Sequence, residues 1–187
     1  TGDHKETVDR HQLCFVRTGL FGVEVRGQRQ IADANSVVLL RNGVPYCTDH
    51  PAPEHDVCTV VELDTSTYRA LTGTPDDISQ EYDVPWTVRT VDRPAHAQFR
   101  ALVSELFDGQ HDLDRALSIE ERALALGGAM LRTPTPAQDG ERSETIRARR
   151  ALIEDVKELV ALDLHAPLTL DQVAQQVAWS PFDLTRV

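Results

Sequence analysis

The chain lacks the features of a membrane-anchored or disulfide-stapled protein. No apolar run approaches the roughly 20 residues that span a bilayer, and the first ten residues are polar and unlike a signal peptide. The 187 residues include only three cysteines, an odd number in a chain long enough to build its own core, which favours reduced thiols over disulfides. We therefore expect a cytoplasmic protein without a membrane partner.

Positive charge is also scarce. The 19 lysine and arginine residues face 30 aspartate and glutamate residues, so the net charge is −11, and unaided non-specific binding to a phosphate backbone is disfavoured. Gly-x-Ser-x-Gly, Walker-type and dinucleotide-binding motifs are absent as well. We expect a binding protein rather than an enzyme.

The first 92 residues read as short strands separated by turns. Phe21, Val23 and Val25 alternate with less apolar residues, which predicts a half-buried strand. The β-prone run 12–17 lies just upstream, and a short Thr-Gly connection between the two runs predicts a hairpin. Further β-prone runs lie at 36–40, 57–63 and 84–91. Many short strands of this kind are typical of a sandwich or barrel.

The hydrophobic period changes at Pro94. Residues 94–108 carry an apolar stripe with helical spacing, and Pro94 suits the first turn of a helix. A second helix is predicted from Ser118, where Glu121 would complete a capping box, to residue 132. Residues 133–143 contain two prolines, a glycine and no large apolar side chain, which predicts an interdomain linker.

The segment 144–187 is the most informative part of the sequence. A long amphipathic helix is predicted up to residue 164. Thr169 then provides a helix N-cap with Gln172 three residues later, and Ser180-Pro181 starts another helix almost at once. Two short helices behind a supporting helix favour a helix-turn-helix, with an ordinary helical hairpin as the alternative.

This segment resembles the first helix-turn-helix of AraC/XylS-type transcription regulators in both caps, the turn length and the core leucine. The matching positions are Thr169, Val173, Ala174, Ser180, Pro181, Leu184 and Arg186. The strand region resembles the cupin-like sensor half of the same family at 32–37, 43–46 and 50–51. The resemblance implies an α+β fold, with a cupin-like β-barrel followed by helices and a partial all-α helix-turn-helix domain.

The resemblance and the changes of pattern together imply four segments. They are an effector-sensing barrel at 1–92, a helical dimerisation and packing region at 93–132, a linker at 133–143, and a truncated helix-turn-helix DNA-binding domain at 144–187. An amphipathic pattern still runs at the last residue, so we expect a fragment of a longer regulator. The implied function is ligand-responsive transcription regulation by a homodimer that binds double-stranded DNA through the complete DNA-binding domain.

Two sets of candidate contact residues follow from the resemblance. The recognition helix would present Phe182, Thr185 and Arg186 to the major groove. A small-molecule effector inside the barrel would contact Phe21, Val23 and Val25, for which plain core packing is the alternative role.

Sulfur and imidazole side chains indicate a second effector class. Cys47, His50 and Cys58, with Cys14 on a nearby strand, are of the types that bind zinc, another soft metal or trivalent arsenic. Free cysteines that act as small apolar core residues are the alternative. A cupin-fold metal-dependent enzyme is the rival class of protein, but the clustered His-x-His of such enzymes is missing from the sequence.

Overall fold

The computed structural model describes residues 5–51, 55–73, 87–108, 113–132, 143–162 and 167–185. Within these ranges the strands are β1 His11–Thr18, β2 Leu20–Val25, β3 Gln28–Asp33, β4 Ser36–Leu40, β5 Tyr46–Asp49, β6 Val57–Leu63 and β7 Val88–Thr90. The helices are α1 Thr65–Thr72, α2 Arg93–Phe107, α3 Leu113–Arg132, α4 Ser143–Leu162, α5 Leu170–Gln176 and α6 Pro181–Leu184.

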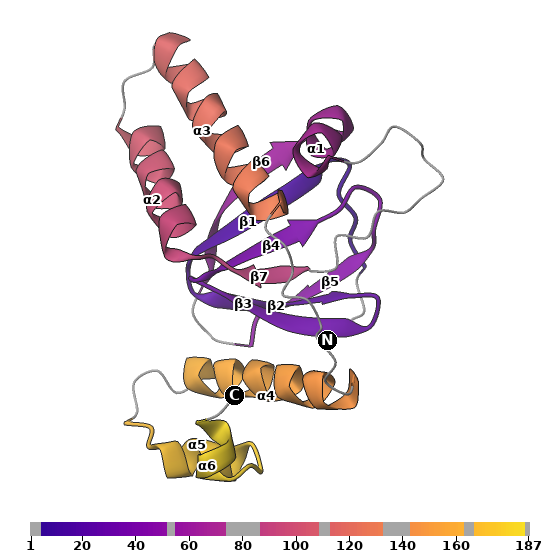
Figure 1. The fold of residues 1–187 in the computed structure, drawn as a ribbon, viewed down its shortest axis with the longest axis vertical. Helices are drawn as coiled ribbons and strands as arrows, with labels where there is room; N and C mark the ends of the chain where they lie inside the picture. The colour runs from indigo at the N-terminus through magenta and orange to yellow at the C-terminus, as the bar shows by residue number, and fades with distance from the viewer. Residues whose placement is uncertain are drawn as a thin grey trace.

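The strands form two antiparallel sheets, which confirms the α+β class. One sheet has the order β6-β1-β4-β7 and the other β3-β2-β5. In the described residues these are two separate ladders rather than a closed barrel. Figure 1 shows α2 and α3 beside the sheet that contains β1, α4 below β2 and β3, and α5 with α6 on the far side of α4.

The predicted hairpin between 12–17 and 21–25 is wrong. β1 pairs with β4 and β6, whereas β2 pairs with β3 and β5. The reason lies at Gly19, whose φ of +73° turns the chain sharply from one sheet into the other. The hairpin partner of β2 is β3, joined through Arg26 and Gly27 with φ of 53° and 76°, the two left-handed positions of a type I′ turn.

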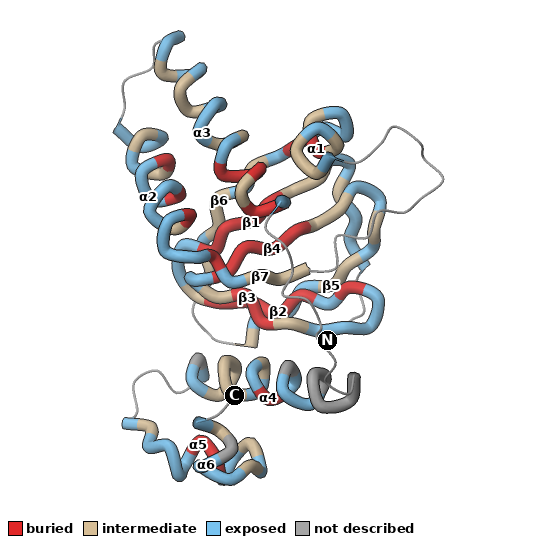
Figure 2. The backbone as a smooth tube through the Cα atoms, viewed as in Figure 1, coloured by how far each residue is buried: buried red, intermediate tan, exposed pale blue. Residues whose placement is uncertain are grey.

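The central strands β1 and β4 of one sheet are buried on both faces. Leu13 and Phe15 belong to an outer core shared with α1, α2 and α3, and the Phe15 ring stacks on that of Phe99 with centroids 4.7 Å apart. Cys14 and Val16, which alternate with them, belong to an inner core between the two sheets. Figure 2 shows the resulting concentration of buried residues along β1, β4 and β2.

Of the two helices predicted between residues 94 and 132, only the first begins where the sequence pattern predicted. α2 begins as predicted, with Pro94 in its first turn and the Asp92 carboxylate accepting a hydrogen bond from the Ala95 N–H. α3 begins at Leu113, so the predicted start at Ser118 is wrong. Residues 113–117 are good helix formers with an acidic residue in the first turn, and they extend the helix through Ser118.

One helix, α1, was not predicted from the sequence. α1 follows β6 directly, capped by Asp64, whose carboxylate accepts a hydrogen bond from the Thr67 N–H. The predicted linker falls largely on 133–142, which lies outside the described residues. No helix in the described ranges has the length and apolar character that crossing a bilayer requires.

The bend at Gly19 generates a stability prediction. A Cβ at this position would lie 2.8 Å from the Asp56 Cα, while a Cβ at Gly27, which has a similar φ, would meet nothing within 4 Å. Gly27→Ala should therefore lower the free energy of unfolding by about 1 kcal/mol, for backbone strain alone. Gly19→Ala adds a backbone clash and should cost about 3 kcal/mol or more. Urea denaturation measures both, and equal losses would contradict this account of the bend.

Candidate functional site

The predicted effector contacts lie in the inner core. Phe21, Val23 and Val25 are buried and point from β2 toward the other sheet, where they join Cys14 and Val16 of β1. The alternation seen in the sequence therefore gives the side chains of β2 one shared interior face. Both sheets contribute to this interior, so a molecule held there would contact both.

Two of the three cysteines meet at the edge of the same core. Cys14 on β1 and Cys58 on β6 share a hydrogen bond, which together with burial raises the pKa of Cys14. The same hydrogen bond lowers the pKa of Cys58, against the opposing effects of burial and of Asp56. The Cys58 Sγ lies 3.8 Å from Asp56 Oδ2, and the other oxygen of Asp56 lies 2.8 Å from the His50 Nδ1.

This arrangement does not assemble the predicted metal site. Cys58 and His50 share Asp56 as a neighbour, whereas Cys47 lies on β5 opposite Glu24 of β2. Across the described ranges, no three His, Cys, Asp or Glu side chains converge in a way that could hold a metal ion. The two neighbouring thiols pack as small side chains at the margin of an apolar core.

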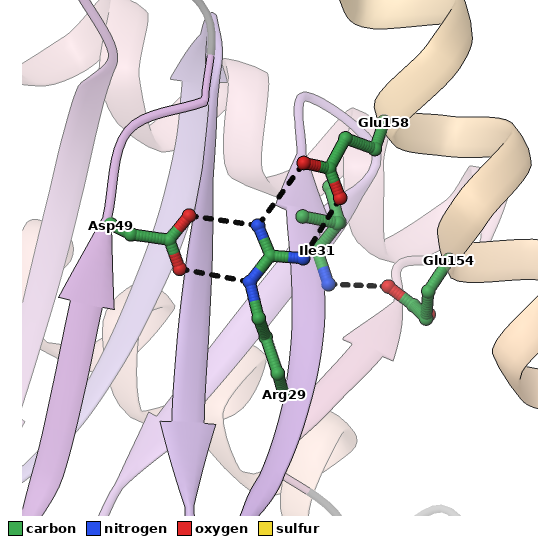
Figure 3. Close-up of polar contacts among 5 residues, drawn as sticks. All are labelled: Arg29, Ile31, Asp49, Glu154 and Glu158. Atoms are coloured by element: carbon green, nitrogen blue, oxygen red, sulfur yellow. Dashed lines mark hydrogen bonds and ion pairs between the residues drawn. The ribbon is translucent and has the colours of Figure 1, made fainter.

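A polar contact joins the second sheet to α4. The Arg29 guanidinium on β3 donates to both oxygens of Asp49, at 2.9 and 2.8 Å, and to Glu158 Oε2 at 2.9 Å. Figure 3 shows the guanidinium held between these two carboxylates, one from β5 and one from α4. The hydrogen bonds raise the pKa of Arg29 and lower that of Asp49, so this charge pairing persists at neutral pH.

The same helix also satisfies the backbone of β3, an edge strand of its sheet. The Ile31 N–H donates a hydrogen bond to the Glu154 carboxylate, and the Ile31 carbonyl accepts one from Lys157 Nζ at 3.2 Å. Lys157 Nζ also lies 3.8 Å from Asp33 Oδ2. An edge strand carries unpaired N–H and C=O groups, and here α4 side chains pair them where another strand would otherwise bind.

Sequence reasoning missed this contact. Its signal on α4 is the spacing of Glu154, Lys157 and Glu158, which places three charges on one helical face. Nothing in that pattern identifies β3 as the partner, since Arg29 and Glu158 are 129 residues apart.

The two short C-terminal helices begin at the predicted positions. Thr169 caps α5 in a full capping box with Gln172, and α6 begins at Pro181. Between them Ala178 has a φ of +56°, and the Trp179 N–H donates to the Ala174 carbonyl at 2.9 Å, the bond of a Schellman motif. Sequence reasoning missed this turn because its left-handed position is alanine rather than glycine.

The predicted DNA contacts lie on or beside α6. The side chains of Phe182 and Thr185 are exposed, and the Thr185 hydroxyl donates to the Phe182 carbonyl at 2.8 Å. Arg186 lies outside the described residues. On α5, Val173 and Ala174 are buried, so this helix uses its apolar face for packing and leaves the start of α6 uncovered.

Comparisons with known proteins define the class of fold. No protein-family model and no curated protein matches the chain. Among solved structures, the AraC-like transcriptional activator CuxR aligns over 95% of this chain with 12% identity and a TM-score of 0.51. The likeness shows that this chain has an AraC-like fold, built of antiparallel sheets with flanking helices.

Structures of ToxT from Vibrio cholerae are also similar. The apo K231A variant aligns over 98% of this chain with 12% identity and a TM-score of 0.48, and the unsaturated fatty acid-bound wild type over 98% with 11% identity and a TM-score of 0.42. The chain spans 59% of the length of CuxR and 67% of that of the ToxT variant.

The contact between β3 and α4 can be measured by a double-mutant cycle. Side-chain exposures of 35% for Arg29 and 32% for Glu158 leave the pair partly screened by solvent, so we expect a coupling of about 0.5–1 kcal/mol between Arg29→Ala and Glu158→Ala in urea denaturation. The coupling should fall as salt rises from low to molar concentration.

A matched cycle serves as the control. Arg29→Ala with Asp49→Ala tests a pair formed within the sheet, whose coupling does not require α4. A coupling for Arg29 with Asp49 but none for Arg29 with Glu158 would show that the helix does not dock on this strand.

Proposed function

We propose that this chain is the sensor and the first part of the DNA-binding domain of a ligand-responsive, AraC-type transcription regulator that acts in the cytoplasm. The observation that carries the proposal is the pair α5 and α6, with its capping box and tight turn, attached through α4 to the edge of an AraC-like sheet. The protein works by binding and not by catalysis. Its segments are the cupin-like sensor 1–92, the helices 93–132, the linker 133–143 and the helix-turn-helix region 144–187.

The DNA-binding surface in this proposal is the start of the second short helix. Phe182 and Thr185 are exposed there, and Arg186 follows them in the sequence, which is the placement of major-groove contacts in helix-turn-helix proteins. Residues 143–187 nevertheless contain five basic and seven acidic residues. Phosphate contacts dominate affinity for DNA. We therefore expect this segment to orient the protein on the duplex while adding little to the binding affinity.

The effector in this proposal binds between the two sheets, against Phe21, Val23 and Val25. A small organic molecule is favoured over a metal ion, because that interior is lined by apolar side chains. β2 pairs along its length with β3, and β3 carries the contacts with α4. An effector that prefers one spacing of the sheets would therefore shift how α4 and the helices after it are presented.

The homodimer in this proposal forms through the linked ends of α2 and α3. Phe107, Leu113 and Leu117 are 70%, 77% and 58% exposed, and these helix ends project beyond the sheets (Figure 1). Large apolar side chains gathered at one end of a helix pair are typical of a protein interface.

Dimerisation is tested by sedimentation. The chain should sediment as a dimer at micromolar concentration, and Leu113→Glu with Leu117→Glu should shift it to a monomer, because charged groups would be buried without partners. Val160→Glu, at a similarly apolar and partly exposed position of α4, should leave the dimer intact. A dimer that survives the double substitution would refute this interface.

DNA binding is tested by NMR with a 30-base-pair duplex of random sequence at low salt. Backbone amide shifts should concentrate in α5 and α6, and Phe182→Ala should weaken binding several-fold, whereas Gln98→Ala on α2 should not change it. At physiological salt the dissociation constant should exceed about 10 µM because few phosphates are contacted. Shifts that fall on α2 or α3 instead, or tight binding unaffected by Phe182→Ala, would contradict the proposed role of α6.

A further inference from the structure

A groove of about 550 Å³ lies between the end of β1 and α2, and no residue of β2 belongs to its lining. It is lined by Val16 and Arg17 of β1, Ala34 and Asn35 of the following turn between β3 and β4, and His96, Phe99, Arg100, Val103 and Ser104 of α2. Its floor is apolar and buried, since Val16 belongs to the inner core and Phe99 to the outer core. The groove thus lies where the two cores of the protein meet.

The walls of this groove are cationic in a protein that carries a net charge of −11. Arg17, His96 and Arg100 contribute basic side chains, and no acidic residue is part of the lining. The Arg17 guanidinium lies 5.0 Å from the centroid of the Phe107 ring. Among the described residues the structure records no hydrogen bond or ion pair for the side chains of His96 and Arg100, so both are available to a ligand.

The polar contacts near the groove leave this charge uncompensated. Asp33 precedes the lining residues Ala34 and Asn35, and its Oδ1 already accepts hydrogen bonds from the Asn35 N–H and the Ser36 hydroxyl, both at 2.8 Å. Its other carboxylate oxygen lies 3.8 Å from Lys157 Nζ of α4. Glu105, which follows the lining residue Ser104, lies 3.1 Å from Arg122 Nε. Both acids next to the lining in sequence are therefore paired, and the groove keeps two guanidinium groups beside an apolar floor.

We propose that this groove binds a small amphipathic carboxylate, with the carboxylate between Arg17 and Arg100 and the apolar body on Phe99 and Val103. A guanidinium group matches a carboxylate in two parallel hydrogen bonds, and the volume is that of a site for a small molecule. The apolar floor argues for an organic anion rather than for phosphate alone. This site differs from the interior assigned to the effector above, and the ligand would hold α2 against β1.

The test is NMR titration of residues 1–187 with benzoate, 4-phenylbutanoate and indole-3-acetate, each against its neutral amide. At least one carboxylate should shift the amides of the groove residues, and its amide should bind about tenfold more weakly, the loss expected for one charged hydrogen bond. Arg100→Gln should weaken the carboxylate by a similar factor. Arg93→Gln, at the exposed start of α2 outside the groove, is the matched control and should leave affinity unchanged.

Three results would overturn the proposal. The first is the absence of amide shifts in the groove residues with all three carboxylates at 10 mM. Binding with a dissociation constant above about 10 mM is too weak to count as a site. The second is equal binding of acid and amide, or equal loss in Arg93→Gln and Arg100→Gln. The third is binding of inorganic phosphate as strong as that of the best carboxylate, which would show that the apolar floor takes no part.

Discussion

The structure depends on one sheet whose central strands, β1 and β4, are buried on both faces. Alternate residues of β1 enter different cores, Leu13 and Phe15 the outer one and Cys14 and Val16 the inner one. Such a sheet is stable only if both faces are covered, so the helices after residue 92 must pack on one side and the second sheet on the other. The stacked rings of Phe15 and Phe99 join β1 to the covering helix α2. The bend at Gly19 places β2 in the second sheet, which covers the other face.

A second constraint follows from the first, because the smaller sheet ends in an exposed edge. β3 would offer its free backbone groups to any other strand, and edge strands are commonly protected by charge or by a covering element. Here α4 provides both, since Glu154 and Lys157 pair with the Ile31 backbone and Glu158 with Arg29. The helix that protects this edge is also the one that precedes α5 and α6 in the chain.

The few basic side chains of this acidic chain are distributed unevenly. Some of the basic side chains are paired with carboxylates, as Arg29 is with Asp49 and Glu158 and Lys157 is with Asp33. The basic groups of the groove between β1 and α2 stand out against that background. The three ligand sites proposed above, which are the interior behind β2, the groove beside α2 and the start of α6, lie on different elements of the fold. Coupling between such sites requires an element with two arrangements that both sites bias.

The sequence by itself determined the features that neighbouring residues encode. The alternation of Phe21, Val23 and Val25 specified the interior face of β2, Asp92 and Pro94 the start of α2, and Thr169 with Gln172 the cap of α5. Only the tertiary structure decided which surfaces meet: β1 beside β4 and β6, Cys14 beside Cys58, and Arg29 against Glu158. Periodicity and capping act over a few residues, whereas the choice of partner depends on the burial of whole faces, which no local pattern contains.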